Sequence, residues 1–347
     1  MNSQIEKNKK IDVLSLELHE LERETELSGI QKFRAKQVFE WLHLKKATQF
    51  DEMTNISAQM RAVFGDKFYI NLLKIQKRLE SNRRDTVKYL YELQDGNRIE
   101  TVLMRHRDRN SLCVSSQAGC RMGCRFCAST VAGFGRNLTP SEMLLQLYET
   151  LRDGNTVDSI VIMGIGEPLD NFSATLKFLE LLRSAHGMSL RRVSLSTCGL
   201  ADKIDELAGL KLGVTLSVSL HAASDEERSE IMPINRRFGI ERLLESCRGY
   251  FTATSRRISF EYALISGVND SEIHAGRLAG LLLKKMPRGS FHVNLIPVNE
   301  VNETPFKKSG NARIFADVLV KSGVNATIRR TMGGDISAAC GQLRAEN

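Results

Sequence analysis

The chain has 347 residues, 42% of them hydrophobic and 26% charged, which is enough for one large domain and a small one. No stretch approaches the roughly 20 consecutive apolar residues of a membrane span, and the charged start has no apolar signal-peptide region, so we expect a cytoplasmic protein without membrane association. The formal charge of +8 favours a polyanionic partner, and seven cysteines in such a chain indicate metal binding or thiol chemistry rather than a disulfide scaffold.

The first part of the chain is expected to be helical over roughly 65 residues. Phe33, Val38, Phe39 and Leu42 fall near the i, i+4 spacing of one helix face, with charged residues between them. The pattern therefore predicts a small helical domain at the N-terminus.

A basic stretch follows the helical part. Its charges are opposed by few acids, mainly Asp66, Glu80 and Asp85. Such a run is more often a solvated surface, and contact with an RNA backbone is the alternative. The basic residues are Lys67, Lys74, Lys77, Arg78, Arg83, Arg84 and Lys88.

Two β-rich runs within residues 86–104 flank the dipeptide Asp95-Gly96. This dipeptide is typical of tight turns, so the pattern predicts a β-hairpin. We place a domain boundary here. The expected division is an accessory domain at 1–100, helical and then a hairpin with a candidate RNA contact, followed by a core at 101–347.

From Ser111 onward, short apolar or β-branched runs alternate with longer helical patterns, such as those at 140–152 and 271–285. Strands separated in this way need crossover helices, which indicates parallel pairing in right-handed βαβ units. Six such units favour an α/β fold, an incomplete (βα)6 TIM-like barrel, with a doubly wound open sheet as the alternative. The expected strands are 112–116, 159–164, 192–197, 214–220, 258–264 and 291–296, with a further short run at 326–330.

A cysteine motif follows the first of these strands. Cys120, Cys124 and Cys127 have the spacing C-x3-C-x2-C, and Gly119 and Gly123 can bend the backbone so that all three thiolates face one point. A [4Fe–4S] cluster normally takes four cysteines. Three thiolates therefore predict a cluster with one iron open to a substrate or cofactor.

A structural zinc site is the alternative for these cysteines. Zinc needs four ligands, and Cys113 is the nearest spare thiol. The usual zinc pattern has two paired ligand sets far apart, and the sequence offers no second pair. The spacing therefore favours the cluster, and a zinc-dependent RNA-binding protein is the alternative function.

The motif, with Phe126 before its last cysteine, resembles the signature of the radical S-adenosylmethionine (SAM) superfamily. From about Phe33 onward the chain also resembles the RlmN family, which methylates C2 of adenine in 23S rRNA and tRNA. The landmarks are CVSSQAGC, GFGRNLTPSE, MGIGEPLDN, LSTCG, VSLHA, IMPIN, GVNDS, VNLIPVN and DISAACGQL. The related Cfr family methylates C8 and remains the alternative, although Ala118, Pro168 and the pair Ser129-Thr130 look more like RlmN.

The resemblance implies a radical mechanism with a [4Fe–4S] cluster and two SAM molecules per turnover. It implies that Cys340 carries the methyl group as S-methylcysteine and that Cys113 resolves the protein–RNA adduct through a transient disulfide. Glu100 matches the family's proton acceptor. Cys198 and Cys247 match no family role and are expected to be structural.

The stretch GIGEP holds the expected SAM-binding pair Gly166 and Glu167, since a glycine lets backbone approach a ligand and a carboxylate can accept hydrogen bonds from an ammonium group. The resemblance also implies 23S rRNA or tRNA, or both, as substrate, a reducing electron donor, and a monomer. The pairs Arg236-Arg237, Lys307-Lys308 and Arg329-Arg330 are candidates for contact with the RNA backbone. The further SAM-binding positions that the family implies are Ser196, Ser219, Leu220, His221 and Asn299.

Overall fold

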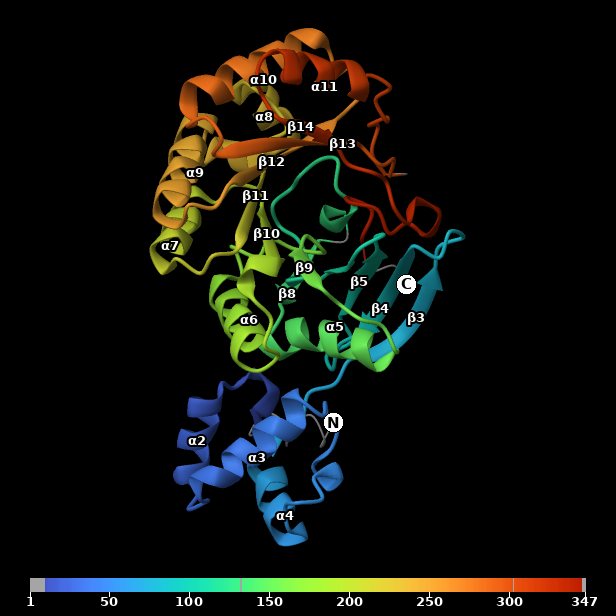
Figure 1. The fold of residues 1–347 in the computed structure, drawn as a ribbon. Helices are drawn as coiled ribbons and strands as arrows, with labels where there is room; N and C mark the ends of the chain where they lie inside the picture. The colour runs from blue at the N-terminus through green and yellow to red at the C-terminus, as the bar shows by residue number, and fades with distance from the viewer. Residues whose placement is uncertain (1–9, 132, 302, 345–347) are drawn as a thin grey trace.

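The computed structural model describes residues 10–131, 133–301 and 303–344. The expectation that the chain starts without a signal peptide rests partly on the first nine residues, which lie outside this range. Within it, a helical unit at the N-terminus is followed by a large sheet flanked by helices (Figure 1). Among the described helices, none combines the length and the apolar character needed to cross a membrane.

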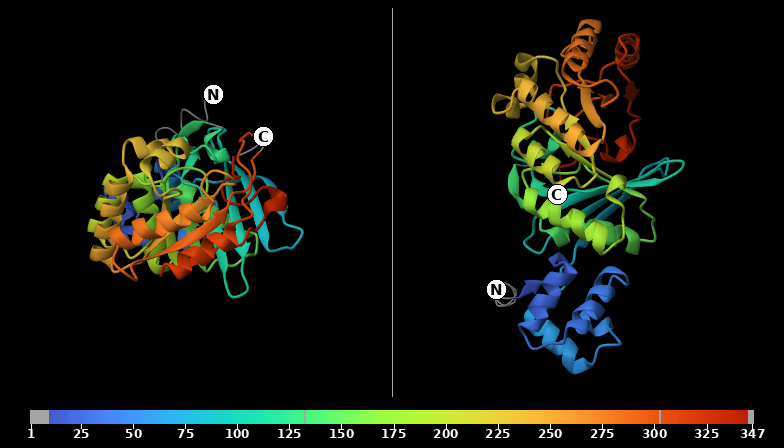
Figure 2. Two further views of the ribbon diagram at one scale, coloured as in Figure 1. Left: turned by 90° about the horizontal axis from the view of Figure 1, so that it is seen from above. Right: turned by 60° about the vertical axis from the view of Figure 1, so that its left-hand side comes forward.

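The N-terminal unit is helical, as the sequence predicted, and forms a lobe beside the core (Figure 2). Val38 and Leu42 are buried, whereas Phe33 is about half exposed. A buried hydrogen bond of 2.8 Å between His43 and Tyr148 joins the lobe to the core. Its elements are β1 (Ile11–Asp12), α2 (Leu18–Glu26), α3 (Lys32–His43), α4 (Ala58–Lys67) and β2 (Phe68–Tyr69).

The core is a ten-stranded sheet in which seven strands pair in parallel and three pair antiparallel at one edge. The runs predicted as strands all form strands, with ends shifted by a few residues. The parallel strands are β6 (Asn110–Cys113), β9 (Ser159–Ile162), β10 (Val193–Thr197), β11 (Thr215–Ser219), β12 (Ile258–Leu264), β13 (Phe291–Pro297) and β14 (Ala326–Ile328). The antiparallel strands are β3 (Lys74–Glu80), β4 (Thr86–Glu92) and β5 (Arg98–Arg105), and a separate pair consists of β7 (Gln117–Gly119) and β8 (Phe134–Asn137).

Neighbouring parallel strands follow chain order without reversal. Right-handed crossovers then put all connecting helices on one face of the sheet, and Figure 1 shows them around the outside of a curved sheet. Because the strand order does not reverse, the doubly wound alternative is wrong. The edge strands β14 and β3 do not pair with each other, so the barrel is open and the predicted incomplete barrel is confirmed. The helices are α5 (Pro140–Arg152), α6 (Phe172–Ser184), α7 (Ala201–Leu210), α8 (Asp225–Ile231), α9 (Ile240–Thr254), α10 (Glu272–Lys285) and α11 (Ala312–Lys321).

Strands β3–β5, here called the antiparallel wing, extend the sheet beyond β6. The predicted hairpin is confirmed, since β4 and β5 pair with Glu92 opposite Arg98 and Gly96 in the turn has a φ of 83°. The division expected after residue 100 falls inside β5, and the sheet runs across it. On this pairing we propose that the accessory unit ends near Tyr69.

The chain after β14, residues 329–344, runs back to the antiparallel wing and is here called the C-terminal segment (Figure 1). The backbone N–H of Asn82 donates to Asp335 at 2.8 Å. At the other end of the segment, Ser129 donates from its hydroxyl to the carbonyl of Leu343 at 2.7 Å. These contacts bring Cys340 to the carboxyl ends of the parallel strands.

Candidate active site

A cavity, here called the main cavity, opens at the carboxyl ends of the parallel strands, where a barrel of this kind binds its ligands. Leu220, Cys113 and Glu100 are predicted site residues that do not line it. The other ten do, namely Cys120, Cys124, Cys127, Gly166, Glu167, Ser196, Ser219, His221, Asn299 and Cys340.

The cysteine loop connects β7 to β8 and is held by backbone hydrogen bonds. The N–H of Cys120 donates to the carbonyl of Gly133 at 3.0 Å, and that of Cys127 donates to the carbonyl of Cys124 at 3.1 Å. Gly119 has a φ of 80°, and a Cβ there would lie 1.9 Å from the Gly133 oxygen, so this turn requires glycine. Burial raises the pKa of the Cys120 thiol to about 12 and also raises the pKa of Cys124 and Cys127.

The donor set fits an iron–sulfur cluster better than a single ion. Among the described residues, no three His, Cys, Asp or Glu side chains are close enough together to hold one metal ion. A cubane instead offers each thiolate a different corner iron, so its ligands line a cavity, as Cys120, Cys124 and Cys127 do. Binding to iron would also favour the thiolate form that burial alone disfavours.

The turn after β9 requires Gly166 and positions Glu167. Gly166 has a φ of 105°, and a Cβ there would lie 2.6 Å from that of Gln117. The Glu167 carboxylate accepts hydrogen bonds from the backbone N–H groups of Cys198 at 2.7 Å and Leu169 at 3.0 Å. Burial raises the pKa of Glu167. The carboxylate therefore ties the β9 turn to the end of β10 while lining the main cavity, and its contact with SAM stays a prediction.

His221 follows β11 in a left-handed backbone conformation, with a φ of 60°. Its Nδ1 accepts a hydrogen bond from the backbone N–H of Ala263 at 2.9 Å, and its ring packs edge-on against Phe126 of the cysteine loop. Burial lowers the pKa of His221 to about 3, so the ring is neutral at pH 7. His221 thus joins β12 to the cysteine loop, whereas Leu220 is fully buried in the core.

A buried arginine fixes two of the strand ends. The Arg228 guanidinium donates to the carbonyls of Cys198 at 2.7 Å, Ser219 at 2.9 Å and Leu220 at 3.1 Å. It also donates to the side chain of Asn235 at 2.9 Å. Because carbonyls left unpaired by the ends of β10 and β11 are satisfied in this way, this wall of the cavity has a defined shape.

A second cavity, here called the side cavity, adjoins the first and is lined by Cys113 and Cys340. Cys340, Asn299 and Arg329 line both cavities, and the Asn299 amide donates to the Cys340 carbonyl at 3.0 Å. Burial raises the pKa of Cys113 to about 12. The nearby Cys340 raises the pKa of Arg329, with smaller contributions from Glu261 and Cys113. The two thiols that the family pairs therefore share one cavity.

Glu100 lies in a third pocket, beneath the C-terminal segment, together with Lys88. It projects from the middle of β5 and is 2% exposed. Val102, on the same face of β5, is paired with Cys113 and packs with it against Leu343 of the C-terminal segment. The segment thus covers the sheet face that carries both Glu100 and Cys113.

Two charged side chains at the site were missed as site residues. The sequence pattern indicates Arg329, with Arg330, as a contact for RNA backbone, whereas in the structure Arg329 lines the cavity of the two thiols. Lys88 was counted in the basic stretch, although it is buried against Glu100. The alternation of side chains between the two faces of β4 and β5 is the sequence signal that indicates Lys88, because side chains on the same face of neighbouring strands contact each other.

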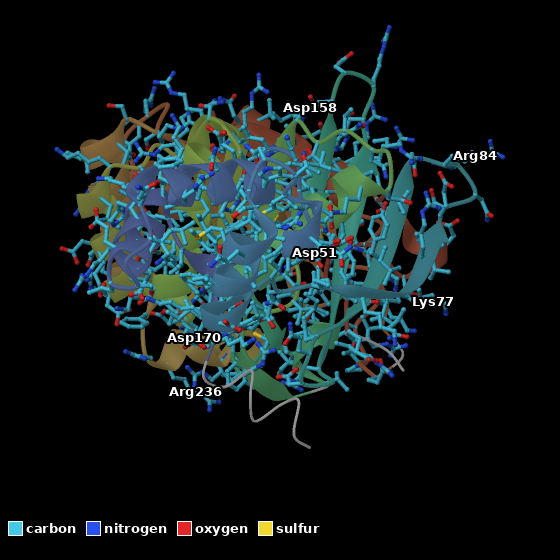
Figure 3. The ribbon with its side chains drawn as sticks, turned by 90° about the horizontal axis from the view of Figure 1, so that it is seen from below. Asp51, Lys77, Arg84, Asp158, Asp170 and Arg236 are labelled. Atoms are coloured by element: carbon cyan, nitrogen blue, oxygen red, sulfur yellow. The ribbon has the colours of Figure 1, made fainter. Side chains whose placement is uncertain are left out.

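The basic stretch is only partly a free surface. Lys67 pairs with Glu24, and Arg78 pairs with Asp153 at 2.9 Å. Figure 3 shows Lys77 and Arg84 at the outer rim of the antiparallel wing. These positions stay candidates for contact with RNA.

Comparisons with known sequences and structures identify similar proteins. Residues 114–276 match the radical SAM superfamily, and residues 11–70 match the ribosomal RNA large subunit methyltransferase N-terminal domain. A probable dual-specificity RNA methyltransferase RlmN of Lachnoclostridium phytofermentans is 46% identical over 340 residues, covering 96% of this chain and 94% of the relative. One of Clostridium perfringens strain 13 is 48% identical, covering 96% of each chain. A radical SAM methyltransferase from Sphaerobacter thermophilus has a similar crystal structure, with a TM-score of 0.91 and 40% identity over 97% of this chain and all of that one.

Proposed function

This chain belongs to the RlmN family of radical SAM RNA methyltransferases, and on that premise we propose that it methylates C2 of an adenine in RNA. The proposed route uses an S-methylcysteine at Cys340 and a transient disulfide between Cys340 and Cys113. One observation carries the proposal: Cys340 lines both the cavity of the cluster cysteines and the cavity of Cys113. A cysteine in this position can receive a methyl group from the side of the main cavity, and the Cys113 thiol can attack its sulfur from the side cavity.

Cys120, Cys124 and Cys127 would hold the cluster, and the surrounding strand ends would hold SAM. When bound there, the cluster and SAM supply methyl transfer to sulfur and one-electron chemistry at carbon, with one SAM used for each. The substrate demands this chemistry because C2 of adenine lies between two ring nitrogens. It is electron-poor and is not a nucleophile, so it cannot attack the methyl group of SAM directly.

The chain's own residues complete the reaction in the proposed route. In that route the S-methyl group of Cys340 loses one hydrogen atom to the radical that the second SAM would supply, its carbon bonds to C2, and the cluster, when bound, would take up the adduct's unpaired electron. Glu100 then accepts the C2 proton. The Cys113 thiolate then attacks the Cys340 sulfur, so that an S–S bond forms and the S–C bond breaks. The bonding electron pair stays on the carbon, which takes up a proton and becomes the methyl group. Reduction of the disulfide by an external donor prepares the next turnover.

The proposed substrates are 23S rRNA, tRNA or both, in keeping with the dual specificity in the relatives' names. A target adenine must be unstacked or presented in a loop to reach a cavity of this kind. We propose that the protein acts as a monomer in the cytoplasm, with a cellular reductant as electron donor.

Analysis of the methylated product tests this function. The anaerobically reconstituted protein is incubated with SAM, reductant and either rRNA or tRNA, and the digested RNA is separated by chromatography with mass detection. We expect 2-methyladenosine from at least one RNA. The appearance of 8-methyladenosine instead would assign the Cfr-type reaction, and an unmodified digest from both RNAs would contradict the proposal.

A further inference from the structure

An ion pair is buried between the antiparallel wing and the C-terminal segment. The Lys88 ammonium lies 2.9 Å from a carboxylate oxygen of Glu100. Lys88 is 7% exposed and Glu100 2%. Two charges hidden from water are costly unless they are paired with good geometry, so each of these side chains constrains the other.

The sheet register creates the pair. Leu90 of β4 lies opposite Glu100 of β5, and Lys88 lies opposite Val102. Lys88 is therefore the diagonal neighbour of Glu100 on the same face of the sheet. A strand on each side fixes the backbone of both residues, so the position of the Glu100 carboxylate depends on the Lys88 head group.

The same pair holds the segment that carries Cys340. The Lys88 ammonium donates to the carbonyl of Ser337 at 3.2 Å, and the backbone N–H of Arg344 donates to the second Glu100 oxygen at 2.8 Å. These two contacts bracket Cys340 on either side along the chain. Ser337 has a left-handed φ of 51°, a conformation that a serine adopts only where its surroundings hold it.

Other charged groups also face this pocket. Lys77 comes from β3, Arg98 from β5 and Asp335 from the C-terminal segment. Lys77 is exposed, so water screens its charge. Arg98 is only partly buried, whereas Lys88 is itself buried and lies in ion-pair contact with Glu100.

We propose that Lys88 is a positioning residue for the methyl-transfer reaction: it orients Glu100 for proton removal and ties Glu100 to the segment that delivers Cys340. This inference rests on the proposed function, because it takes Glu100 as the acceptor of the C2 proton. In the step concerned the C2–H bond breaks, its electron pair stays on the base and the proton passes to a Glu100 oxygen. Lys88 acts through Glu100 and does not itself take part in the proton transfer.

The test is a double-mutant cycle with Lys88→Met, Glu100→Gln and the double variant, all anaerobically reconstituted. Three quantities are measured: the rate of RNA methylation, the S-methylation of Cys340 by mass spectrometry, and the amount of covalent protein–RNA adduct. In Lys88→Met we expect methylation to fall roughly 10- to 100-fold, in the range of a disturbed acid–base step, with Cys340 still methylated and adduct accumulating. The double variant should be no slower than Glu100→Gln, since both changes disable one step.

Lys285→Met is the matched control, because Lys285 pairs with Glu241 on the helices outside the barrel. It should methylate RNA at the wild-type rate. If Lys88→Met does not fold, the uncharged double variant removes both buried charges, and Lys88→Arg, which keeps a cation, should retain more activity than Lys88→Met.

Three results would overturn the role of Lys88. The first is a near-normal rate of RNA methylation in Lys88→Met, and the second is a loss of Cys340 S-methylation as large as the loss of methylated RNA. The third is a double variant whose loss of rate equals the product of the losses in the two single variants. Failure of the proposed function is a different outcome. In that case the wild-type protein itself would show neither S-methylated Cys340 nor adduct.

Discussion

The carboxyl ends of the parallel strands and the antiparallel wing contribute to the proposed site by different routes. At the strand ends, topology alone gathers the cysteine loop, Glu167, Ser196 and Ser219 around the main cavity. At the wing, Glu100 comes from the middle of a strand, and the C-terminal segment returns to cover it. Neighbouring strand ends in the first region are tied by contacts such as that of Glu167 with Cys198, whereas the wing meets the segment through contacts between residues more than 200 positions apart.

This difference implies that the two regions have different roles. Buried polar contacts such as those of Arg228 fix the wall where cofactors would bind. In the proposed reaction, the wing and the C-terminal segment hold the residues that meet the base and then release it. Substitutions in the two regions should therefore impair RNA methylation in different ways.

The largest effect is expected for Cys124→Ala, which removes one proposed cluster ligand at the strand ends. Iron and sulfide should fall to background, and methylation should drop by more than about 1,000-fold, because the radical chemistry is lost altogether. Metal analysis and the methylation assay measure both quantities. Cys247→Ala is the control, since Cys247 is buried in the core away from both cavities. Full iron content in Cys124→Ala would remove this residue from the ligand set.

A smaller effect, with the opposite pattern, is expected for Glu100→Gln in the wing. Iron content should be normal while methylation falls by roughly 100-fold, because a neutral amide cannot accept the proton. The same two assays separate this variant from Cys124→Ala. Loss of iron together with activity would mean that the two regions do not work separately.

A pH effect of about tenfold per unit is expected for resolution of the adduct, because only the thiolate form of Cys113 attacks. Burial raises the pKa of Cys113 to about 12, so between pH 7 and 9 the thiol predominates and its thiolate fraction rises with pH. Decay of the adduct after rapid quenching should therefore accelerate as pH rises. A rate that is flat or falls over this range would contradict resolution by Cys113.

The smallest effect is expected for Gly166→Ala, which strains the strand-end wall. The added Cβ would meet Gln117 at a φ of 105°, so the free energy of unfolding should fall by roughly 1–3 kcal/mol. SAM affinity measured by equilibrium dialysis should weaken several-fold, while iron content is kept. Gly276→Ala on α10, where a Cβ meets nothing within 4 Å, is the control. Unchanged stability would show that the turn can relax.

The sequence predicted the strand-end region better than the wing for a physical reason. Parallel strands in chain order place their carboxyl ends together, so Cys120 and Glu167 could be grouped from spacing and strand position. Ser219, which the family resemblance singled out, ends a strand at the same edge. Nothing local connects Glu100 to Arg344 or Lys88 to the segment that carries Cys340, and those contacts depend on how the chain returns after β14. Only the family resemblance singled out the three side chains proposed to react. Lys88 lies in a basic run that is typical of a solvated surface, and only its place beside Glu100 on paired strands indicates otherwise.

Mapping the covalent adduct in Cys113→Ala tests most directly whether the two thiols share one reaction. The variant, loaded with iron, SAM and RNA, should accumulate protein–RNA adduct that yields, after digestion, a peptide with Cys340 joined through one carbon to adenine. Cys340→Ala should yield neither adduct nor methylated RNA. An adduct on another residue, or normal turnover without Cys113, would contradict the assignment of carrier and resolver.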